Sequence, residues 1–192
     1  MTKNLVVNFW EEKVRVEASL LTSLECFNPY FHSLVRPNPL LPTPGSNPHE
    51  VSKAVVQCKM KSGRYRTSLL ARHWSPTNPN GYCPAPTCQG IPETLQHLLI
   101  SCPYYTRIRT RLIRIWTQPQ TISELHTLLV AVLSGPSDQL LHFILDPTSH
   151  HQIIHLCQAN GQELLNPLFY LTRTCCYSIH KHRLKLLKQW KF

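Results

Sequence analysis

One short segment constrains this chain more than any other, because it places metal-binding side chains on a backbone that has little to bury. Proline recurs through residues 75–92, so this segment cannot form a regular helix or strand. The spacing C-x4-C-x8-H-x4-C begins in this segment with Cys83 and Cys88 and continues just after it with His97 and Cys102. Three thiolates and one imidazole complete the tetrahedral set of a structural zinc site, with no open position for catalysis. The sequence therefore predicts one structural Zn²⁺, whose binding supplies folding energy that the segment lacks.

The local spacing favours the same four ligands. Cys83 and Cys88 flank the turn Pro-Ala-Pro-Thr, which can aim two thiolates at one point. His97 and Cys102 are five residues apart, a little over one helical turn, so they are expected to share a face. The alternative interpretation is a set of buried free cysteines beside an unrelated histidine.

Helices are predicted along most of the chain, because apolar residues recur at helical spacing and no alternating pattern of useful length indicates a strand. Asn47, Pro48 and Glu50 are typical of a helix start, and Gly63 of a helix stop. The expected helices cover residues 5–25, 48–62, 65–74, 93–102, 104–116, 121–135, 137–145, 148–160 and 167–190. We therefore expect an all-α fold, a small helical domain with a zinc-stapled, proline-rich knuckle and a long basic C-terminal helix.

At 192 residues and 22.2 kDa the chain can form one domain with appendages. We divide it into an N-terminal helix (1–27), a proline-rich linker (28–47) and a zinc-binding helical domain (48–192) that contains the knuckle (82–103). The N-terminal helix is expected to carry an apolar stripe of Val6, Phe9, Val16, Leu20 and Leu24.

The charge of the chain favours a polyanionic partner. It has 20 Lys and Arg against 10 Asp and Glu, a net charge of +10 and a pI near 9.4. Such an excess favours phosphate neutralisation with counterion release. Four arginines lie on the helix expected after the zinc ligands, in a stretch without acids from residue 94 to 123. They are Arg107, Arg111 and Arg114, which share one face, and Arg109, which flanks them.

A second candidate nucleic-acid surface combines cations with aromatic rings. Arg64, Arg66 and Arg72 lie close in sequence to Tyr65 and Trp74, and this combination can grip phosphates and stack on bases. The alternatives are a solvated helix face for the arginines and core positions for the aromatic rings.

The C-terminal helix also lacks acids beyond Glu163 and combines two kinds of side chain. Its apolar stripe could serve nucleic acid, a partner helix or the core of the domain. The stripe consists of Leu168, Leu171, Cys175, Ile179, Leu186 and Trp190. The basic residues are Arg173, Lys181, Arg183, Lys185, Lys188 and Lys191.

Several classes of protein are disfavoured by what the sequence lacks. Asp138 and Asp146 are the only aspartates, and no cluster of carboxylates can be assembled to hold the paired cations of a two-metal polymerase or ribonuclease. No signal peptide or membrane-spanning stretch is evident, so the eight cysteines are expected to be reduced. We expect an intracellular protein of the nucleus or cytoplasm, neither secreted nor membrane-bound.

The zinc motif and its flanks resemble the zinc-binding region that follows the reverse transcriptase of non-LTR (LINE-type) retrotransposons. The resemblance covers most of residues 50–192. The resemblance implies a tail that grips template RNA or target DNA while a separate polymerase domain copies RNA. The paired catalytic aspartates of that polymerase domain have no counterpart here. The similar stretches are Cys83-x4-Cys88, ETLQHLLISCP (93–103) with its arginine-rich helix, GRYRT (63–67), RHW (72–74), FILDP (143–147) and LTR (171–173).

We therefore expect a non-catalytic, zinc-stabilised segment that binds RNA, DNA or both. One alternative is a protein-interaction module that docks on a polymerase core through the knuckle and the C-terminal stripe. A zinc hydrolase is a second alternative, although it requires an open coordination position. The third is a decayed element fragment without a function of its own.

Overall fold

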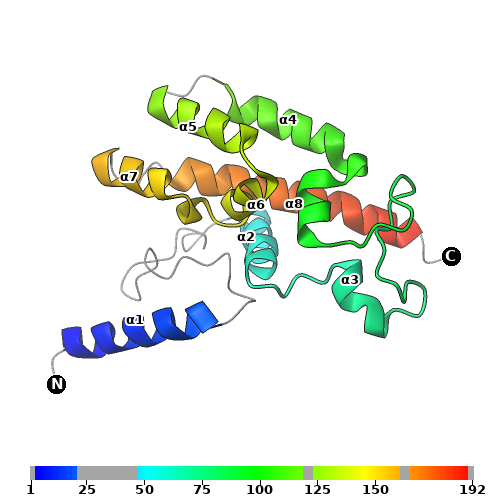
Figure 1. The fold of residues 1–192 in the computed structure, drawn as a ribbon, viewed down its shortest axis with the longest axis horizontal. Coiled ribbons are helices and arrows are strands. Elements are labelled where there is room, and N and C mark those ends of the chain that lie inside the picture. Colours follow the sequence, from blue (N-terminus) through cyan, green and yellow to red (C-terminus); the bar gives the residue numbers. More distant parts are fainter. Residues whose placement is uncertain (1–2, 21–46, 119–122, 161–164, 190–192) are drawn as a thin grey trace.

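The computed structural model describes residues 3–20, 47–118, 123–160 and 165–189, and the regular structure in these residues is helical (Figure 1). The all-α prediction is therefore confirmed for this part of the chain. The α-helices are α1 (Lys3–Leu20), α2 (Pro48–Lys61), α3 (Ser68–Ala71), α4 (Thr106–Trp116), α5 (Ser123–Ser134), α6 (Ser137–Leu145), α7 (His151–Asn160) and α8 (Leu165–Gln189). Short helical turns are η2 (Arg72–Trp74), η3 (His97–Ser101), η4 (Pro103–Tyr105) and η5 (Pro147–Ser149). No helix among the described residues is long and apolar enough to span a membrane.

The start and stop of α2 follow from the residues predicted to cap it. The side chain of Asn47 accepts a hydrogen bond of 2.9 Å from the backbone N–H of His49, and Pro48 takes the first helical position. The helix ends just before Gly63, whose φ of 66° lies in the left-handed region that commonly terminates helices.

The long helix α8 forms the centre of the molecule and contacts α2, α4 and α6 (Figure 1). Most side chains of its apolar stripe belong to the core, because they are almost completely removed from solvent. Leu171 is half-buried, and Trp190 lies outside the described residues. The structure thus assigns most of the stripe to the protein's own core. The buried members are Leu168, Cys175, Ile179 and Leu186.

Two buried polar networks join α2 to distant parts of the chain. The Gln57 amide nitrogen donates to the Ile144 carbonyl at 2.8 Å and lies 3.0 Å from the Thr172 hydroxyl, so one side chain links α2, α6 and α8. Lys61 and Asp146 form a buried ion pair with an N–O distance of 2.5 Å. Because burying a charge without a partner is costly, this pair holds the end of α2 against the turn after α6.

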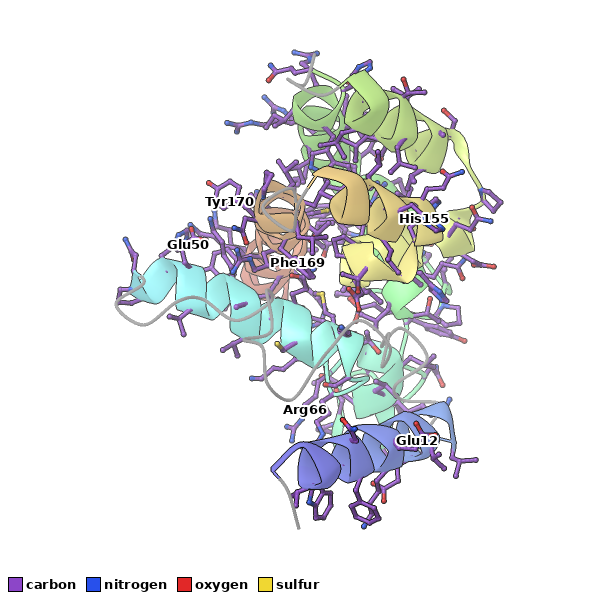
Figure 2. The ribbon with its side chains drawn as sticks, turned by 90° about the vertical axis from the view of Figure 1, so that its left-hand side faces the viewer. Glu12, Glu50, Arg66, His155, Phe169 and Tyr170 are labelled. Carbon is purple, nitrogen blue, oxygen red and sulfur yellow. The ribbon has the colours of Figure 1, made fainter. Side chains whose placement is uncertain are left out.

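Neighbouring residues on different sides of α8 differ sharply in their exposure to solvent. Phe169 is fully buried, whereas its neighbour Tyr170 lies half exposed on the outer side of the helix (Figure 2). The Lys53 ammonium lies 4.8 Å from the centre of the Tyr170 ring and 2.7 Å from a carboxylate oxygen of Glu50. Polar contacts of this kind close the outer edge of the α2–α8 interface.

Helix α1 confirms part of the N-terminal prediction and lies to one side of the other helices (Figure 1). The predicted helix of residues 5–25 is helical to residue 20, and its last residues and the linker at 28–46 lie outside the described residues. Val6, Phe9, Val16 and Leu20 are all exposed, so the predicted stripe is not buried by the described residues. Leu24 lies outside them.

Several predicted boundaries were wrong, each for a local reason. Within 65–74 only residues 68–71 are α-helical, because Thr67 caps the turn by accepting a hydrogen bond from the Leu70 N–H at 3.3 Å. Residues 93 and 94 are not helical, because Pro92 pairs with Tyr82 in an isolated antiparallel bridge. The predicted helix at 148–160 begins as a 3₁₀ turn at residues 147–149 and becomes α-helical at 151. The first two residues of the helix predicted at 121–135 lie outside the described residues.

Candidate metal centre

A closed loop presents the first two cysteines. The Cys83 N–H donates to the Ile91 carbonyl at 2.8 Å, and the Glu93 N–H donates to the Gly81 carbonyl at 3.0 Å. Inside this loop the Cys88 N–H bonds back to the Ala85 carbonyl at 2.9 Å. The proline-rich knuckle is therefore a hydrogen-bonded loop that turns Cys83 and Cys88 to the same side.

The other two candidate ligands are brought together by a π-turn and not by the expected α-helix. The Cys102 N–H donates to the His97 carbonyl at 2.7 Å, which is the i to i+5 bond of a π-turn. Residues five apart are about 140° apart around an α-helix. The wider turn reduces this offset and brings His97 and Cys102 closer to one face, which is why a spacing of five suits ligands of one metal ion.

All four predicted ligands converge in the interior. Their ligand atoms lie within 4.8 Å of one another, and Cys102 Sγ is 3.8 Å from Cys83 Sγ and 3.6 Å from Cys88 Sγ. Each of the four residues is at most 7% exposed, and the cysteines form no disulfide. The His97 Nε2 atom is buried and has no hydrogen-bond partner among the described residues. Such an orphaned nitrogen fits a metal ligand, so this cluster can hold one metal ion.

The three thiols are too close together to ionise independently. The hydrogen bond from Cys83 lowers the pKa of Cys102 to about 5, and the same bond raises the pKa of Cys83. Burial raises the pKa of Cys88. A cation that binds here would displace the remaining protons, because the thiolate is the metal-binding form.

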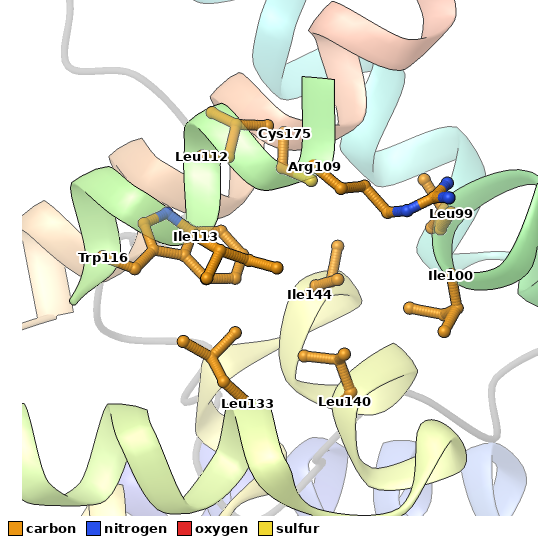
Figure 3. Close-up of a pocket in the computed structure, with 10 residues that line it drawn as sticks. All are labelled: Leu99, Ile100, Arg109, Leu112, Ile113, Trp116, Leu133, Leu140, Ile144 and Cys175. Carbon is orange, nitrogen blue, oxygen red and sulfur yellow. The ribbon is translucent and has the colours of Figure 1, made fainter. Parts of the chain in front are cut away.

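Arg109 supports this centre from α4 and does not lie on the face of the other arginines. Its guanidinium Nη2 donates to the Cys102 carbonyl at 2.5 Å and to the Thr106 hydroxyl at 3.1 Å. The side chain is half-buried, and desolvation lowers the pKa of Arg109. It also reaches along an apolar cavity of about 110 Å³ toward Leu99, with Trp116 at the far end (Figure 3).

The remaining predicted nucleic-acid residues lie on two separate parts of the surface. Those on α4 and those around α3 are all exposed, but α3 lies across α8 from α4, so the structure does not bring the two sets together (Figure 1). Of the aromatic rings predicted to accompany the second set, that of Tyr65 belongs to the core, since this residue is only 5% exposed. The first set is Arg107, Arg111 and Arg114; the second is Arg64, Arg66 and Arg72.

The Tyr65 side chain connects the second set to α8. Its hydroxyl lies 2.9 Å from His180 Nδ1, and its ring lies 5.6 Å from the guanidinium carbon of Arg183. Burial raises the pKa of Tyr65 to about 12 and lowers the pKa of His180. A neutral phenol can therefore donate to a neutral imidazole, which is a structural contact.

A buried ion pair beside the metal centre was missed by the sequence analysis. Arg183 binds both carboxylate oxygens of Glu93, at 2.8 and 2.7 Å, and the Ser68 N–H donates to the same carboxylate. Arg183 is 6% exposed, although its place in a basic helix suggested a surface residue. The one available signal was the position of Glu93, an isolated acid directly after the proline-rich loop.

Comparisons of the chain with protein-family models, with curated proteins and with solved structures found no match. The functional argument therefore depends on the metal centre and on the surfaces attached to it.

Proposed function

We propose that this chain contains a non-catalytic, zinc-stabilised domain that binds RNA or DNA. The observation that carries the proposal is the direct connection between the four-ligand cluster and α4, since η4 and α4 follow Cys102 without a linker. Metal binding then fixes the helix whose outer face carries Arg107, Arg111 and Arg114. Guanidinium groups suit this role because each can donate two hydrogen bonds to one phosphate.

Zinc fits the cluster better than other common metals. Sulfur ligands about 2.3 Å from a tetrahedral zinc ion lie about 3.8 Å from one another. The two measured sulfur separations from Cys102, 3.8 and 3.6 Å, match this spacing. A set of three thiolates and one imidazole also favours zinc over calcium or magnesium, which prefer oxygen ligands. Four protein ligands leave no position for substrate, so we assign the site a structural role and not the chemistry of a hydrolase.

Two further observations support the choice among the alternatives. The apolar stripe of α8 is largely buried in the domain itself, so the interaction module loses one of the two surfaces, the stripe, that would dock on a polymerase core. The resemblance to the tail of non-LTR retrotransposon reverse transcriptases supports nucleic acid as the partner. We therefore propose a segment of such an element protein, working with a separate polymerase domain inside the cell.

The experiment measures metal content first and nucleic-acid affinity second. Elemental analysis of protein purified without chelator should find about one zinc ion per chain, and Cys102→Ser should lose it. The control is Cys58→Ser, a half-buried cysteine outside the cluster, which should keep the metal. If three or four phosphates are neutralised, affinity falls with salt along a log–log slope of about −2 to −4.

The arginine surface is then tested by replacing Arg107, Arg111 and Arg114 together with Gln. This variant should flatten the slope by about 2 to 3, because each neutralised phosphate contributes about 0.7 to 0.9. The control Lys13→Gln/Lys59→Gln removes exposed cations from α1 and α2 and should keep the slope. A zinc-free wild-type protein, or a slope that the triple variant leaves unchanged, would contradict the proposal.

A further inference from the structure

Helices α4 and α8 run side by side and enclose a groove of about 470 Å³ on the outside of the molecule (Figure 1). Arg107 and Arg111 line it from α4, and Ser178 and His182 line it from α8. Its apolar lining includes Ile115, which is partly exposed. The groove is thus a concave site with arginines on one wall and hydroxyl and imidazole side chains on the other.

The electrostatic character of the groove is uniform. Neither α4 nor α8 contains a single Asp or Glu, so neither wall supplies a carboxylate that would neutralise the arginines. Lys181 and Lys185 are exposed on α8 and lie on the same helical face as Ser178, which extends the basic surface along that wall. An anionic chain lying in the groove would therefore meet positive charge along its length.

The wall formed by α8 also offers polar groups. The Ser178 side chain lines the groove and is half-buried. His182 donates from Nδ1 to the Ser178 carbonyl at 2.8 Å, so its Nε2 is the nitrogen that is not used in this bond. These groups can exchange hydrogen bonds with the sugar and phosphate oxygens of a nucleotide.

The width of the groove selects the form of nucleic acid. The axes of packed helices lie about 8–10 Å apart, so a groove between them admits an extended single strand but not the body of a double helix. From Arg107 to Ile115 the groove wall is about 12 Å long, at 1.5 Å per residue, which is enough for a short run of nucleotides.

We propose that the α4–α8 groove binds a single nucleic-acid strand by its backbone. The phosphates lie against Arg107 and Arg111, and the sugar and phosphate oxygens lie against Ser178 and His182. The described lining contains no aromatic ring other than the imidazole, so base stacking adds little and sequence preference is weak. This inference rests on the proposed function and specifies which surface and which form of nucleic acid it involves.

The test compares an oligothymidine of about 12 nucleotides with the same strand paired to its complement. Fluorescence anisotropy of the zinc-loaded chain should show at least about tenfold tighter binding of the single strand, because only it enters the groove. Ser178→Asp introduces a carboxylate into the groove and should weaken single-strand binding by about tenfold or more. Ser52→Asp, an exposed serine on α2, is the matched control and should bind as the wild type does.

A second variant keeps the test independent of folding defects. Arg107→Gln/Arg111→Gln leaves the buried residues of α4 unchanged and should also lose single-strand affinity, while zinc content and circular dichroism remain as in the wild type. Equal or tighter binding of the duplex, or equal affinities of Ser178→Asp and Ser52→Asp, would overturn the groove assignment alone. Failure of the wild type to bind either DNA probe or the corresponding oligouridine strand and its duplex would overturn the proposed function itself.

Discussion

At the residue scale, Arg109 shows how α4 serves the metal centre as well as its own outer face. With Zn²⁺ bound, three thiolates and a neutral imidazole would form a complex with one net negative charge. The four side chains that would hold it are buried. The Arg109 guanidinium donates to the carbonyl of the ligand Cys102 and is the cation that α4 turns inward. It can therefore both orient the ligand and balance the charge of the complex.

We expect Arg109→Gln to weaken zinc binding by about 10- to 100-fold, the usual cost of removing a group that orients a metal ligand. Competition with a chromophoric chelator at neutral pH measures this affinity. Arg111→Gln removes the same charge from the outer face of α4 and should leave zinc affinity unchanged. Equal affinities of the two variants would show that Arg109 acts only at the surface.

At the scale of the element, the knuckle depends on one close approach of backbone to backbone. Gly81 has a φ of 68°, and a Cβ added there would lie 2.6 Å from the Leu69 Cα and 3.0 Å from the Ser68 carbonyl oxygen. Gly90 has a similar φ of 74°, but an added Cβ would meet nothing within 4 Å. An alanine would meet the same backbone strain at either position, and the two positions differ in the space around the added Cβ.

This pair separates conformational strain from steric contact. Gly90→Ala should lower the free energy of unfolding by about 1–2 kcal/mol, the cost of a left-handed alanine. Gly81→Ala should cost about 1–3 kcal/mol more, because α3 must move away from the loop. Urea unfolding of the zinc-loaded variants measures both values. Equal losses of unfolding free energy in the two variants would mean that α3 can move away at no cost and does not fix the position of the knuckle.

The element scale also shows what the sequence could predict. The clustering of Cys83, Cys88, His97 and Cys102 was predictable because they lie within 20 residues and metal-binding chemistry depends on residue type and spacing. The π-turn was not, because apolar periodicity near His97 is equally compatible with an α-helix. The role of Arg109 was missed although helical spacing places it on the side of α4 opposite the other three arginines. The spacing does not reveal the Cys102 carbonyl to which it donates.

At the scale of the whole molecule, the Glu93–Arg183 pair fastens the knuckle to α8 and, through the Ser68 N–H, to α3. No periodicity could pair residues 90 positions apart, and a basic helix gave no sign that one arginine points inward. The carboxylate is fully buried. Removal of either partner therefore leaves an uncompensated charge in the interior.

Glu93→Gln should lower the free energy of unfolding by about 3–5 kcal/mol, as expected when one member of a buried pair is lost. The control Glu17→Gln, at the exposed pair with Lys13, should cost no more than about 1 kcal/mol. Thermal and urea unfolding measure both. Adding Arg183→Met to Glu93→Gln should recover part of the loss, and no recovery would mean that the pair is not the source of the effect.

The contrast between local ligands and distant pairs also sets an order of assembly. The metal centre closes a loop of only 20 residues, from Cys83 to Cys102, whereas the Gln57–Thr172 contact closes one of more than a hundred. Closing a short loop loses less chain entropy and occurs sooner. During synthesis the knuckle can capture its ion as soon as Cys102 has emerged. The core must wait for α8, and until then the completed knuckle presents Glu93 to solvent.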